Sequence, residues 1–535
     1  MRSLKTYAVM GFGLGAIIAA AIAQPFPPRP KLVVLIAVDQ FRYDYLTRFE
    51  SEYKGGFRHL LDHGAVFANA NLAHYPAVTA VGHAVMLTGA SPALSGIVGN
   101  NWYDRKVGKN VSSVSDSAER QLDGNGAGAS PRRLLVSTVG DELKLADPTS
   151  RVIGLSLKDR AAILPSGHMA DAACWYDTRT GAFVSSTYYF KELPSWVKSF
   201  NDSRMVEKYA GAEWKFSGGS RRMPANSGPK LANEVDSSPF GNELLEALAE
   251  RAIDSERLGR RSATDLLTVS FSSIDAVGHQ TGPLSPEVHD LVVRLDGTLE
   301  RLFLHLDQTV GLRNVLVVLT ADHGAVDLPE RMSSDRMPGG RILDSQLAAT
   351  VQARLAQQYD AGAWVQSIND GAMFLNSGLI RARNLNEEAV QDDAAAALAA
   401  EPQVFRVYTR HQLRRGELPK DALSETLSAS LNWARSADLQ VILDPYWVRP
   451  ATNISHDTPF AYDTHIPLIF MGPSIRPGLY FQNVKLNDLA PTLASLLSVQ
   501  TPSGSTGRVL YEILPQPAAP AASHASQPVK AGTGR

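Results

Sequence analysis

The sequence is almost without cysteine: Cys174 is the only one among 535 residues. A single cysteine can form no internal disulfide and cannot build a thiolate-rich metal centre. Any metal that this chain binds must therefore be held by carboxylates and imidazoles, a ligand set that suits zinc. We expect Cys174 to be a small, buried apolar side chain.

The chain also lacks a strong net charge, long apolar segments after its first residues, and internal repeats. Its formal net charge is −2, so no long-range field favours nucleic acid or an anionic membrane, and we expect no nucleic-acid partner. With 44% hydrophobic and 20% charged residues, the composition is that of an ordinary globular protein with a large core.

The two ends of the chain differ from the rest in composition. Arg2 and Lys5 precede an apolar run from Ala8 to Ala20, and Ala21-Ile22-Ala23 fits a cleavage site. Residues 1–23 therefore predict a cleaved signal peptide and a periplasmic or secreted protein; the alternative is a retained anchor. No cysteine near the cleavage point offers a lipid anchor, so we expect no stable membrane anchor. Residues 516–535 are rich in Pro, Ala and Ser and predict a disordered tail.

Short apolar runs separated by amphipathic helices predict an α/β fold. Helices are predicted at Asn242 to Ile253 and at Val288 to Leu306, where apolar residues recur on one face. The runs that we interpret as buried parallel strands are Leu32 to Val38, Val152 to Leu157, Leu266 to Phe271, Asn314 to Leu319 and Ile466 to Phe470.

Three stretches predict insertions into this pattern. Residues from about 101 to 135 are rich in Ser, Gly and Asn and indicate a loop, and residues from about 165 to 235 carry many aromatics and predict a lid or cap. Residues from about 340 to 450 have an α/β pattern of their own: a hairpin around Asn369-Asp370-Gly371, a helix from Glu387 to Ala400, and a strand from Val404 to Thr409. We expect an accessory subdomain there.

Aspartate and histidine residues follow three of the predicted strands. Asp39 comes directly after the first, and Asp322-His323 after the fourth. Asp275 and His279 are four residues apart, so a helical turn would direct both to one point. Open parallel sheets place their chemistry beyond the carboxyl ends of the strands. Taken singly, Asp39 is better explained as a helix cap or turn residue, and Asp275 and His279 are explained equally well as a cap and a core histidine. Asp322-His323 is the stronger signal, because two polar residues follow a continuous apolar strand.

Two further features leave alternatives open. His456 and His465 are rival candidates for one more imidazole ligand. Thr79 follows Pro76 and precedes an apolar segment, Ala80 to Leu87, that predicts a helix. A hydroxyl at a helix N-terminus lies among free N–H groups that attract an anion, but an N-cap role explains it as well.

Together these segments resemble the alkaline phosphatase superfamily, and within it the threonine-nucleophile, PafA-type alkaline phosphatases related to type I phosphodiesterases and nucleotide pyrophosphatases. The resemblance covers most of residues 24–515, the predicted catalytic domain. The matching segments are Val38-Asp39, Thr79 to Gly89, Gly96 to Asn100, Leu157 to Arg160, Asp275 to His279, Ala321 to Gly324 and His456 to Pro467.

This resemblance implies a central, mostly parallel sheet between helix layers and a site with two zinc ions. One zinc would be held by Asp275, His279 and His456, a choice that favours His456 over His465. The other would be held by Asp39, Asp322 and His323, with Thr79 as the nucleophile touching it. Asn100, Lys158 and Arg160 would contact phosphate oxygens. One departure is that His456 is followed by Asp457 where the family often has glycine.

The implied function is hydrolysis of small phosphate monoesters through a phosphothreonine on Thr79, with release of inorganic phosphate. Lys158 and Arg160 favour monoesters, because a dianion has oxygens for both cations while a diester has one blocked. The alternatives are a phosphodiesterase or nucleotide pyrophosphatase with the same metals, and a non-catalytic receptor for phosphate esters. A sulfatase is disfavoured, since neither Thr79 nor Cys174 lies in the Cys/Ser-x-Pro-x-Arg context of that branch.

Overall fold

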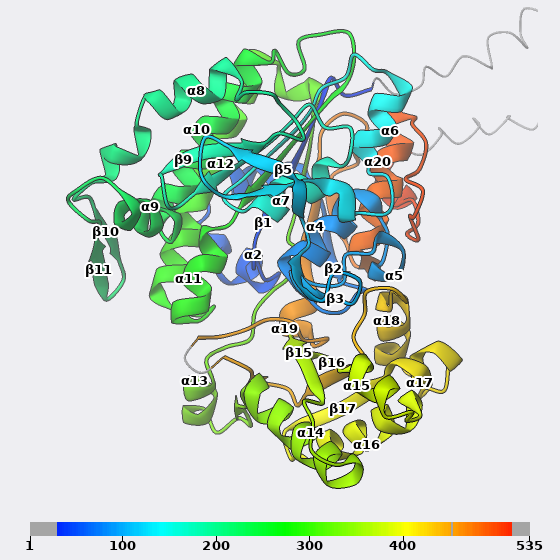
Figure 1. Ribbon diagram of the computed structural model, residues 1–535. Coiled ribbons are helices and arrows are strands. Elements are labelled where there is room, and N and C mark those ends of the chain that lie inside the picture. The colour runs from blue at the N-terminus through cyan, green and yellow to red at the C-terminus, as the bar shows by residue number, and fades with distance from the viewer. Residues whose placement is uncertain (1–28, 451–452, 516–535) are drawn as a thin grey trace, which may run out of the picture.

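A twelve-stranded sheet runs through the larger lobe of the computed structural model, which describes residues 29–450 and 453–515 (Figure 1). The predicted signal peptide and the predicted disordered tail lie outside the described residues. Strand β22 (Val484–Lys485) pairs with β2 at one edge. The order of the other strands is β21 (Gly478–Tyr480), β2 (Ala65–Asn71), β20 (His465–Met471), β13 (Val315–Thr320), β1 (Leu32–Val38), β12 (Asp265–Phe271), β7 (Val152–Ser156), β8 (Ala172–Asp177), β9 (Ala182–Ser186), β5 (Ser115–Leu122) and β6 (Ala127–Ala129).

The centre of the sheet is parallel and buried on both faces. β1 pairs in parallel with β13 and β12, β12 with β7, and β7 with β8. Every residue of β1, β12 and β13 is buried, which explains why they appear in the sequence as continuous apolar runs. The predicted mostly parallel sheet between helix layers is confirmed.

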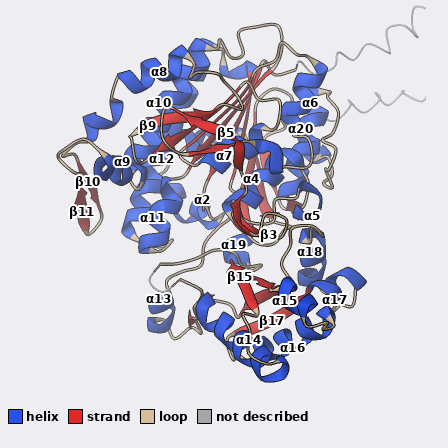
Figure 2. Cartoon of the chain, in the orientation of Figure 1, coloured by secondary structure: helices blue, strands red, loops and turns tan. Residues whose placement is uncertain are grey.

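Helices cover both faces of the sheet (Figures 1 and 2). The long helix α12 begins at Pro286, where Ser285 caps it by accepting a hydrogen bond from Val288 N–H, and it buries the leucines of one face. It packs with α3 (Gly56–His63), α10 (Pro239–Ser255) and α11 (Ser273–Thr281). The other face carries α4 (Thr79–Thr88), α6 (Val139–Ala146), α7 (Asp159–Ser166) and α20 (Leu489–Leu497). Both helices predicted from periodicity are present, within α10 and α12.

The structure corrects two of the sequence interpretations. The run from Ile466 to Phe470 is a buried strand, but β20 pairs antiparallel with β13 and with β2. Residues 101–135 are not a loop: β3 (Asn101–Asp104) pairs with β4 (Lys109–Ser112), and β5 and β6 extend the main sheet. These strands are short and partly exposed, so they carry no apolar run that would predict them.

The stretch from 165 to 235 is also only partly an insertion. Its first strands, β8 and β9, continue the main sheet from β7. Beyond them come α8 (Ser195–Asp202), the hairpin of β10 (Glu213–Phe216) and β11 (Gly219–Arg222), and α9 (Pro229–Asp236). This later part lies along the side of the larger lobe in Figure 1.

A second, smaller lobe is built from the residues predicted as an accessory subdomain. Its antiparallel sheet has the order β15 (Val365–Asn369), β16 (Ala372–Leu375), β18 (Leu439–Leu443) and β17 (Val404–Thr409). Helices α14 (Asp344–Tyr359) and α16 (Glu387–Ala399) pack on it and enclose a separate apolar core. Helices α15 (Ser377–Ala382), α17 (Arg410–Arg415) and α18 (Ala422–Ser430) complete this lobe, which forms the lower part of Figure 1.

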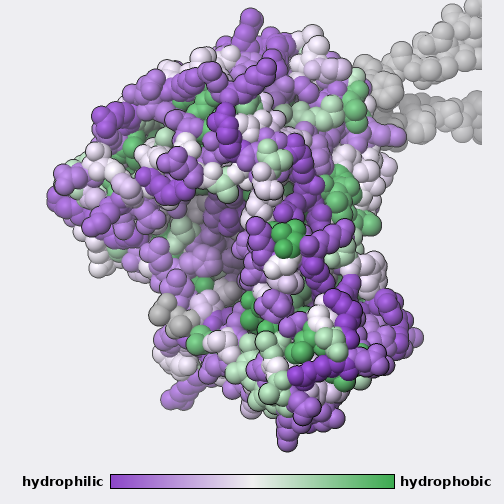
Figure 3. Space-filling model, viewed as in Figure 1, coloured by the Kyte–Doolittle hydropathy of each residue, from purple (hydrophilic) through white to green (hydrophobic). Residues whose placement is uncertain are grey.

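The apolar side chains are concentrated in these cores. The face of the molecule in Figure 3 is mostly hydrophilic, with small apolar patches. Within residues 29–450 and 453–515, no helix has the length and apolar character needed to cross a bilayer. Cys174 lies in β8 with no exposed surface, as expected for a buried apolar residue.

Candidate metal centre and nucleophile

The carboxyl ends of the central strands bring the candidate residues to one edge of the sheet. Ala37 in β1 lies opposite Thr320 in β13, and Val38 lies opposite Phe271 in β12. Asp39 and Asp322 therefore leave the sheet side by side. Helix α11 starts just after β12 and carries Asp275 in its first turn. The register of three strands thus assembles side chains that are far apart in the sequence.

Asp39, Asp322 and His323 form the first of two candidate metal-binding groups. All three side chains have no exposed surface. The Nε2 atom of His323 lies 3.5 Å from Asp39 Oδ1 and 3.5 Å from Asp322 Oδ2. The three side chains therefore converge on one buried point.

Asp275, His279 and His456 form the second group. His279 Nε2 is 3.1 Å and His456 Nε2 is 3.7 Å from Asp275 Oδ1. The His456 ring stacks on His323 with 3.6 Å between ring centroids, so the two groups adjoin. The His279 side chain is 31% exposed, which opens this group toward solvent.

The three imidazoles are oriented in the same way. Their Nδ1 atoms lie 2.8 to 2.9 Å from the backbone carbonyl oxygens of Ile454, Ala77 and Gly324. A neutral imidazole whose Nδ1–H donates to a carbonyl presents the Nε2 lone pair to a metal. The backbone thus selects the tautomer that directs all three Nε2 atoms into the two groups.

Two buried carboxylate oxygens of the first group, Asp39 Oδ1 and Asp322 Oδ2, have no hydrogen-bond partner among the described residues. The Nδ1 atom of His83 lies 3.2 Å from Asp322 Oδ2 but is closer, at 2.9 Å, to the Thr79 carbonyl oxygen. Burial, and then repulsion from Asp275 and Asp322, raises the pKa of Asp39 well above its usual range. Burial also lowers the pKa of His323 and of His456. Crowded carboxylates with free oxygens beside neutral imidazoles are a donor set that fits divalent zinc.

Thr79 lies beside the first group. It is the first residue of α4, and Val78 holds the N-cap position, so Thr79 is not itself the N-cap. Its side chain is buried, and Oγ1 is 3.5 Å from His323 Nε2. The hydroxyl therefore combines two features that favour its ionisation: the positive end of a helix dipole and a neighbouring candidate metal site.

Asn100, Lys158 and Arg160 surround the same edge. Asn100 Oδ1 accepts a hydrogen bond of 2.9 Å from Ala80 N–H at the start of α4. Lys158 Nζ donates to Asp39 at 2.6 Å and to Asp275 at 2.5 Å, so it bridges the two groups. Arg160 is the second residue of α7 and, like Lys158, lines a cavity of about 420 Å³. Of the three residues predicted to contact phosphate, Lys158 touches the candidate ligands directly, Asn100 contacts the helix that carries Thr79, and Arg160 shares a cavity with Lys158.

Two residues that contact the site were not predicted from the sequence. His83 Nε2 is 2.7 Å from Ser270 Oγ, and its Nδ1 is 3.2 Å from Asp322 Oδ2, so it links α4 to the first group. Gln40 donates from Nε2 to Asp275 Oδ1 at 2.7 Å. His83 follows Thr79 by four residues, a spacing that could have placed both on one face of the helix. Gln40 carried no such signal.

His465 belongs to neither group. It begins β20, where its Nε2 is 3.0 Å from the Ala68 carbonyl oxygen and its ring stacks on Tyr43. Of the two rival histidines, only His456 lies in one of the two candidate groups.

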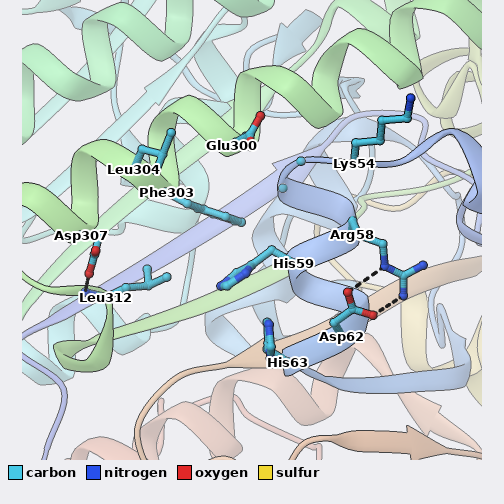
Figure 4. A pocket seen from close by; sticks show the side chains of 12 residues that line it. Lys54, Arg58, His59, Asp62, His63, Glu300, Phe303, Leu304, Asp307 and Leu312 are labelled. Atoms are coloured by element: carbon cyan, nitrogen blue, oxygen red, sulfur yellow. Dashed lines mark hydrogen bonds and ion pairs between the residues drawn. The ribbon is translucent and has the colours of Figure 1, made fainter.

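A second cavity, of about 320 Å³, lies between α3 and α12 (Figure 4). His63 and Leu312 line it and come just before β2 and β13, so it lies at the opposite edge of the sheet from the metal centre. Three of its charged side chains are engaged locally: Arg58 pairs with Asp62, and Asp307 accepts from Leu312 N–H. Both candidate metal-binding groups lie at the other edge.

Comparisons with known proteins agree with this geometry. Residues 33–465 match the family described as type I phosphodiesterase / nucleotide pyrophosphatase. The chain is 37% identical to the alkaline phosphatase PafA of Elizabethkingia meningoseptica over 91% of this chain and 95% of that one. It is 36% identical to the alkaline phosphatase PhoV of Synechococcus elongatus over 91% and 93%. The crystal structure of wild-type PafA matches with a TM-score of 0.86 at 36% identity, over 91% of this chain and 99% of that one.

Proposed function

Because the chain belongs to the type I phosphodiesterase / nucleotide pyrophosphatase family, we propose that it is an exported, zinc-dependent alkaline phosphatase acting on small phosphate monoesters. The observation that carries the proposal is the position of Thr79 Oγ1 beside the first group of ligands, with the second group stacked against it. Relatives that are named alkaline phosphatases support phosphatase activity.

Asp39, Asp322 and His323 would hold one zinc ion, and Asp275, His279 and His456 the other. Bound there, the ions would supply Lewis-acid stabilisation of negative charge on the attacking and leaving oxygens. Thr79 Oγ would attack phosphorus in line with the leaving oxygen, forming the Thr79–O–P bond as the ester P–O bond breaks. Water would then cleave the phosphothreonine, which releases phosphate and restores the hydroxyl. Dividing the reaction in two replaces one difficult step by two easier ones.

The remaining polar side chains would bind the phosphate oxygens. Arg160 offers a planar fork, Lys158 a point charge, and Asn100 an amide NH₂ group that its bond to Ala80 leaves unused. Three donors suit a monoester dianion, whose non-bridging oxygens are all free. Lys158 contacts Asp39 and Asp275 in this structure, so it would exchange those carboxylates for phosphate when zinc neutralises them.

A phosphodiesterase or nucleotide pyrophosphatase is the second candidate, and the family match itself favours it. Such an enzyme would use the same ligands and Thr79. Monoester and diester enzymes would differ in their use of Lys158 and Arg160. One oxygen of a diester carries a second substituent, so a diester cannot accept hydrogen bonds from both cations as a monoester can.

Turnover of p-nitrophenyl phosphate and of bis-p-nitrophenyl phosphate by zinc-loaded protein tests the proposal. We expect elemental analysis to give two zinc ions per chain and the monoester to react faster. Comparable or faster reaction of the diester would establish the phosphodiesterase instead. A protein with only trace zinc and no turnover would be a receptor for phosphate esters.

A further inference from the structure

One buried arginine joins the smaller lobe to the segment that carries His456. Arg449 follows β19 (Trp447–Val448), and its side chain is 8% exposed. One Nη atom donates to Asp457 Oδ2, and the other donates to the Val441 carbonyl of β18 at 2.6 Å. Nε lies 3.3 Å from Asp344 Oδ1 at the start of α14. The guanidinium therefore contacts a strand and a helix of the smaller lobe and the residue next to a candidate ligand.

The turn of the β15–β16 hairpin is shaped to receive this guanidinium. Gly371 has a φ of 75°, in the left-handed region. A Cβ added there would lie 2.9 Å from Arg449 Cζ and 2.6 Å from the Val441 oxygen, both too close for a real contact. Only glycine lets the turn pack directly on Arg449.

Asp457 adopts a backbone conformation that its residue type disfavours. Its φ is 114°, where L-residues meet steric conflict, and its side chain is 3% exposed. Such conformations persist where the surroundings enforce them. The enforcing contacts are the ion pair with Arg449 and a 3.4 Å contact from Ser455 Oγ to Asp457 Oδ1.

The other side of this segment is held by the larger lobe. Ile454 N–H donates to the His279 carbonyl at 3.1 Å, and the Ile454 carbonyl lies 2.8 Å from His279 Nδ1. His456 Nδ1 lies 2.8 Å from the Ala77 carbonyl, just before α4. His456 is therefore fixed between the larger lobe on one side and the Arg449–Asp457 pair on the other.

We propose that Arg449 and Asp457 are positioning residues that set the place of His456 and so couple zinc affinity at the second group to the docking of the smaller lobe. The proposal rests on the proposed function, since it requires zinc at that group. Arg449 and Asp457 touch neither the ion nor the substrate. They act through His456, as the partners that orient a ligand commonly do.

Measurement of zinc affinity distinguishes this positioning role of Arg449 and Asp457 from a role in stability alone. Asp457→Gly removes the carboxylate but tolerates the positive φ, so it folds more readily than a variant that removes the arginine. Arg449→Lys keeps the charge and loses the fork that reaches Asp457 and Val441 together. In chelator competition we expect both variants to release one of the two zinc ions about 10- to 100-fold more readily, with the other ion held as in the wild type.

Arg105→Lys is the matched control. Arg105 donates to the Ser436 carbonyl and to Asp438, so it also joins the two lobes, but it contacts none of the candidate ligands. We expect this variant to keep both zinc affinities. Asp457→Asn, which can still accept from Arg449, should fall between the wild type and Asp457→Gly.

Three outcomes decide between the inferences. Wild-type affinity for both ions in Asp457→Gly and Arg449→Lys would overturn the positioning role while leaving the proposed function intact. An equal loss in Arg105→Lys would overturn it too, because general loosening of the lobes would then explain the effect. A wild-type protein that binds no zinc would overturn both the positioning role and the proposed function.

Discussion

The hydroxyl of Thr79 differs from an ordinary hydroxyl at a helix start in two respects: it is buried, and it lies next to a candidate metal ligand. Thr79 opens α4, whose first N–H groups are unsatisfied within the helix, and Oγ1 lies 3.5 Å from His323 Nε2. A hydroxyl with a purely structural role at a helix start would form hydrogen bonds only within its own helix. The contact with the candidate metal centre is what distinguishes Thr79 from Thr88, which bonds back to Ala84 O at the other end of α4.

We expect Thr79→Ala to keep both zinc ions and lose most monoester turnover, because the ligand groups stay intact while the attacking oxygen is removed. Elemental analysis and p-nitrophenyl phosphate turnover measure the two effects. Thr88→Ala, at the end of the same helix, should retain turnover. If Thr79→Ala worked at the wild-type rate, a different nucleophile would have to be sought.

Replacement of Lys158 and Arg160 together by alanine should harm monoesters far more than diesters. Removal of each charged side chain is expected to cost on the order of 2–4 kcal/mol in the transition state of a dianion. Ratios of kcat/KM for the two p-nitrophenyl substrates give the measurement. Arg179→Ala is the control, since Arg179 lines the same cavity but pairs with Asp177. Equal effects on both substrates would contradict the assignment.

At the scale of elements, the approach of α4 to the metal centre depends on a glycine. Gly82 faces Asp322, and a Cβ added to it would lie 2.6 Å from Asp322 Cβ. No side chain can fit there unless the helix moves. Since α4 also carries Thr79, the spacing between helix and strand end sets the distance from the hydroxyl to the ligands.

Gly82→Ala should therefore lower turnover by at least about 10-fold, because a displacement of even 1 Å can cost about 100-fold in rate. It should also cost about 1–3 kcal/mol in stability through overpacking. Kinetics and denaturant unfolding test both expectations. Gly297→Ala in α12, where an added Cβ meets nothing within 4 Å, should change neither for the worse. Unaltered kinetics in Gly82→Ala would mean that the helix adjusts without moving Thr79.

Helices and strands were predictable from the sequence where burial leaves a local pattern of apolar residues. β1 and β12 follow from continuous apolar runs, and α12 from its periodicity. The direction of β20 was not predictable, because an apolar run indicates burial and says nothing about which strand it joins. β3 to β5 escaped prediction because their side chains are partly exposed and largely polar, so they carry no apolar run that would mark them as strands.

The candidate site shows the same division. Asp39 and Asp322 could be identified because each follows a buried strand, and Asp275 and His279 because their spacing matches one helical turn. The contacts of His83 with Ser270 and Asp322 and of Gln40 with Asp275 could not, since these partners lie far away in the chain. Only the packed structure brings Arg449 against Gly371 and Asp457.

At the scale of the whole molecule, the two ligand groups join segments from β1, α11, β13 and the chain returning from the smaller lobe. An ion that binds only the folded protein stabilises it, by about 4 kcal/mol when present at about 1,000 times its Kd. Treatment with a chelator should therefore lower the Tm by several degrees. Thermal unfolding with and without chelator, and after zinc is added back, measures this. A Tm that stays constant while elemental analysis shows that zinc has been removed would contradict it.

The solitary thiol of Cys174 has a practical consequence. Burial in β8 removes it from solvent and raises its pKa to about 12, so maleimide reagents have no thiolate to attack in the native protein. A cysteine introduced on the surface of each lobe would then be labelled without background. Fluorophores or spin labels at such a pair could follow the separation of the lobes during turnover without first deleting any native residue.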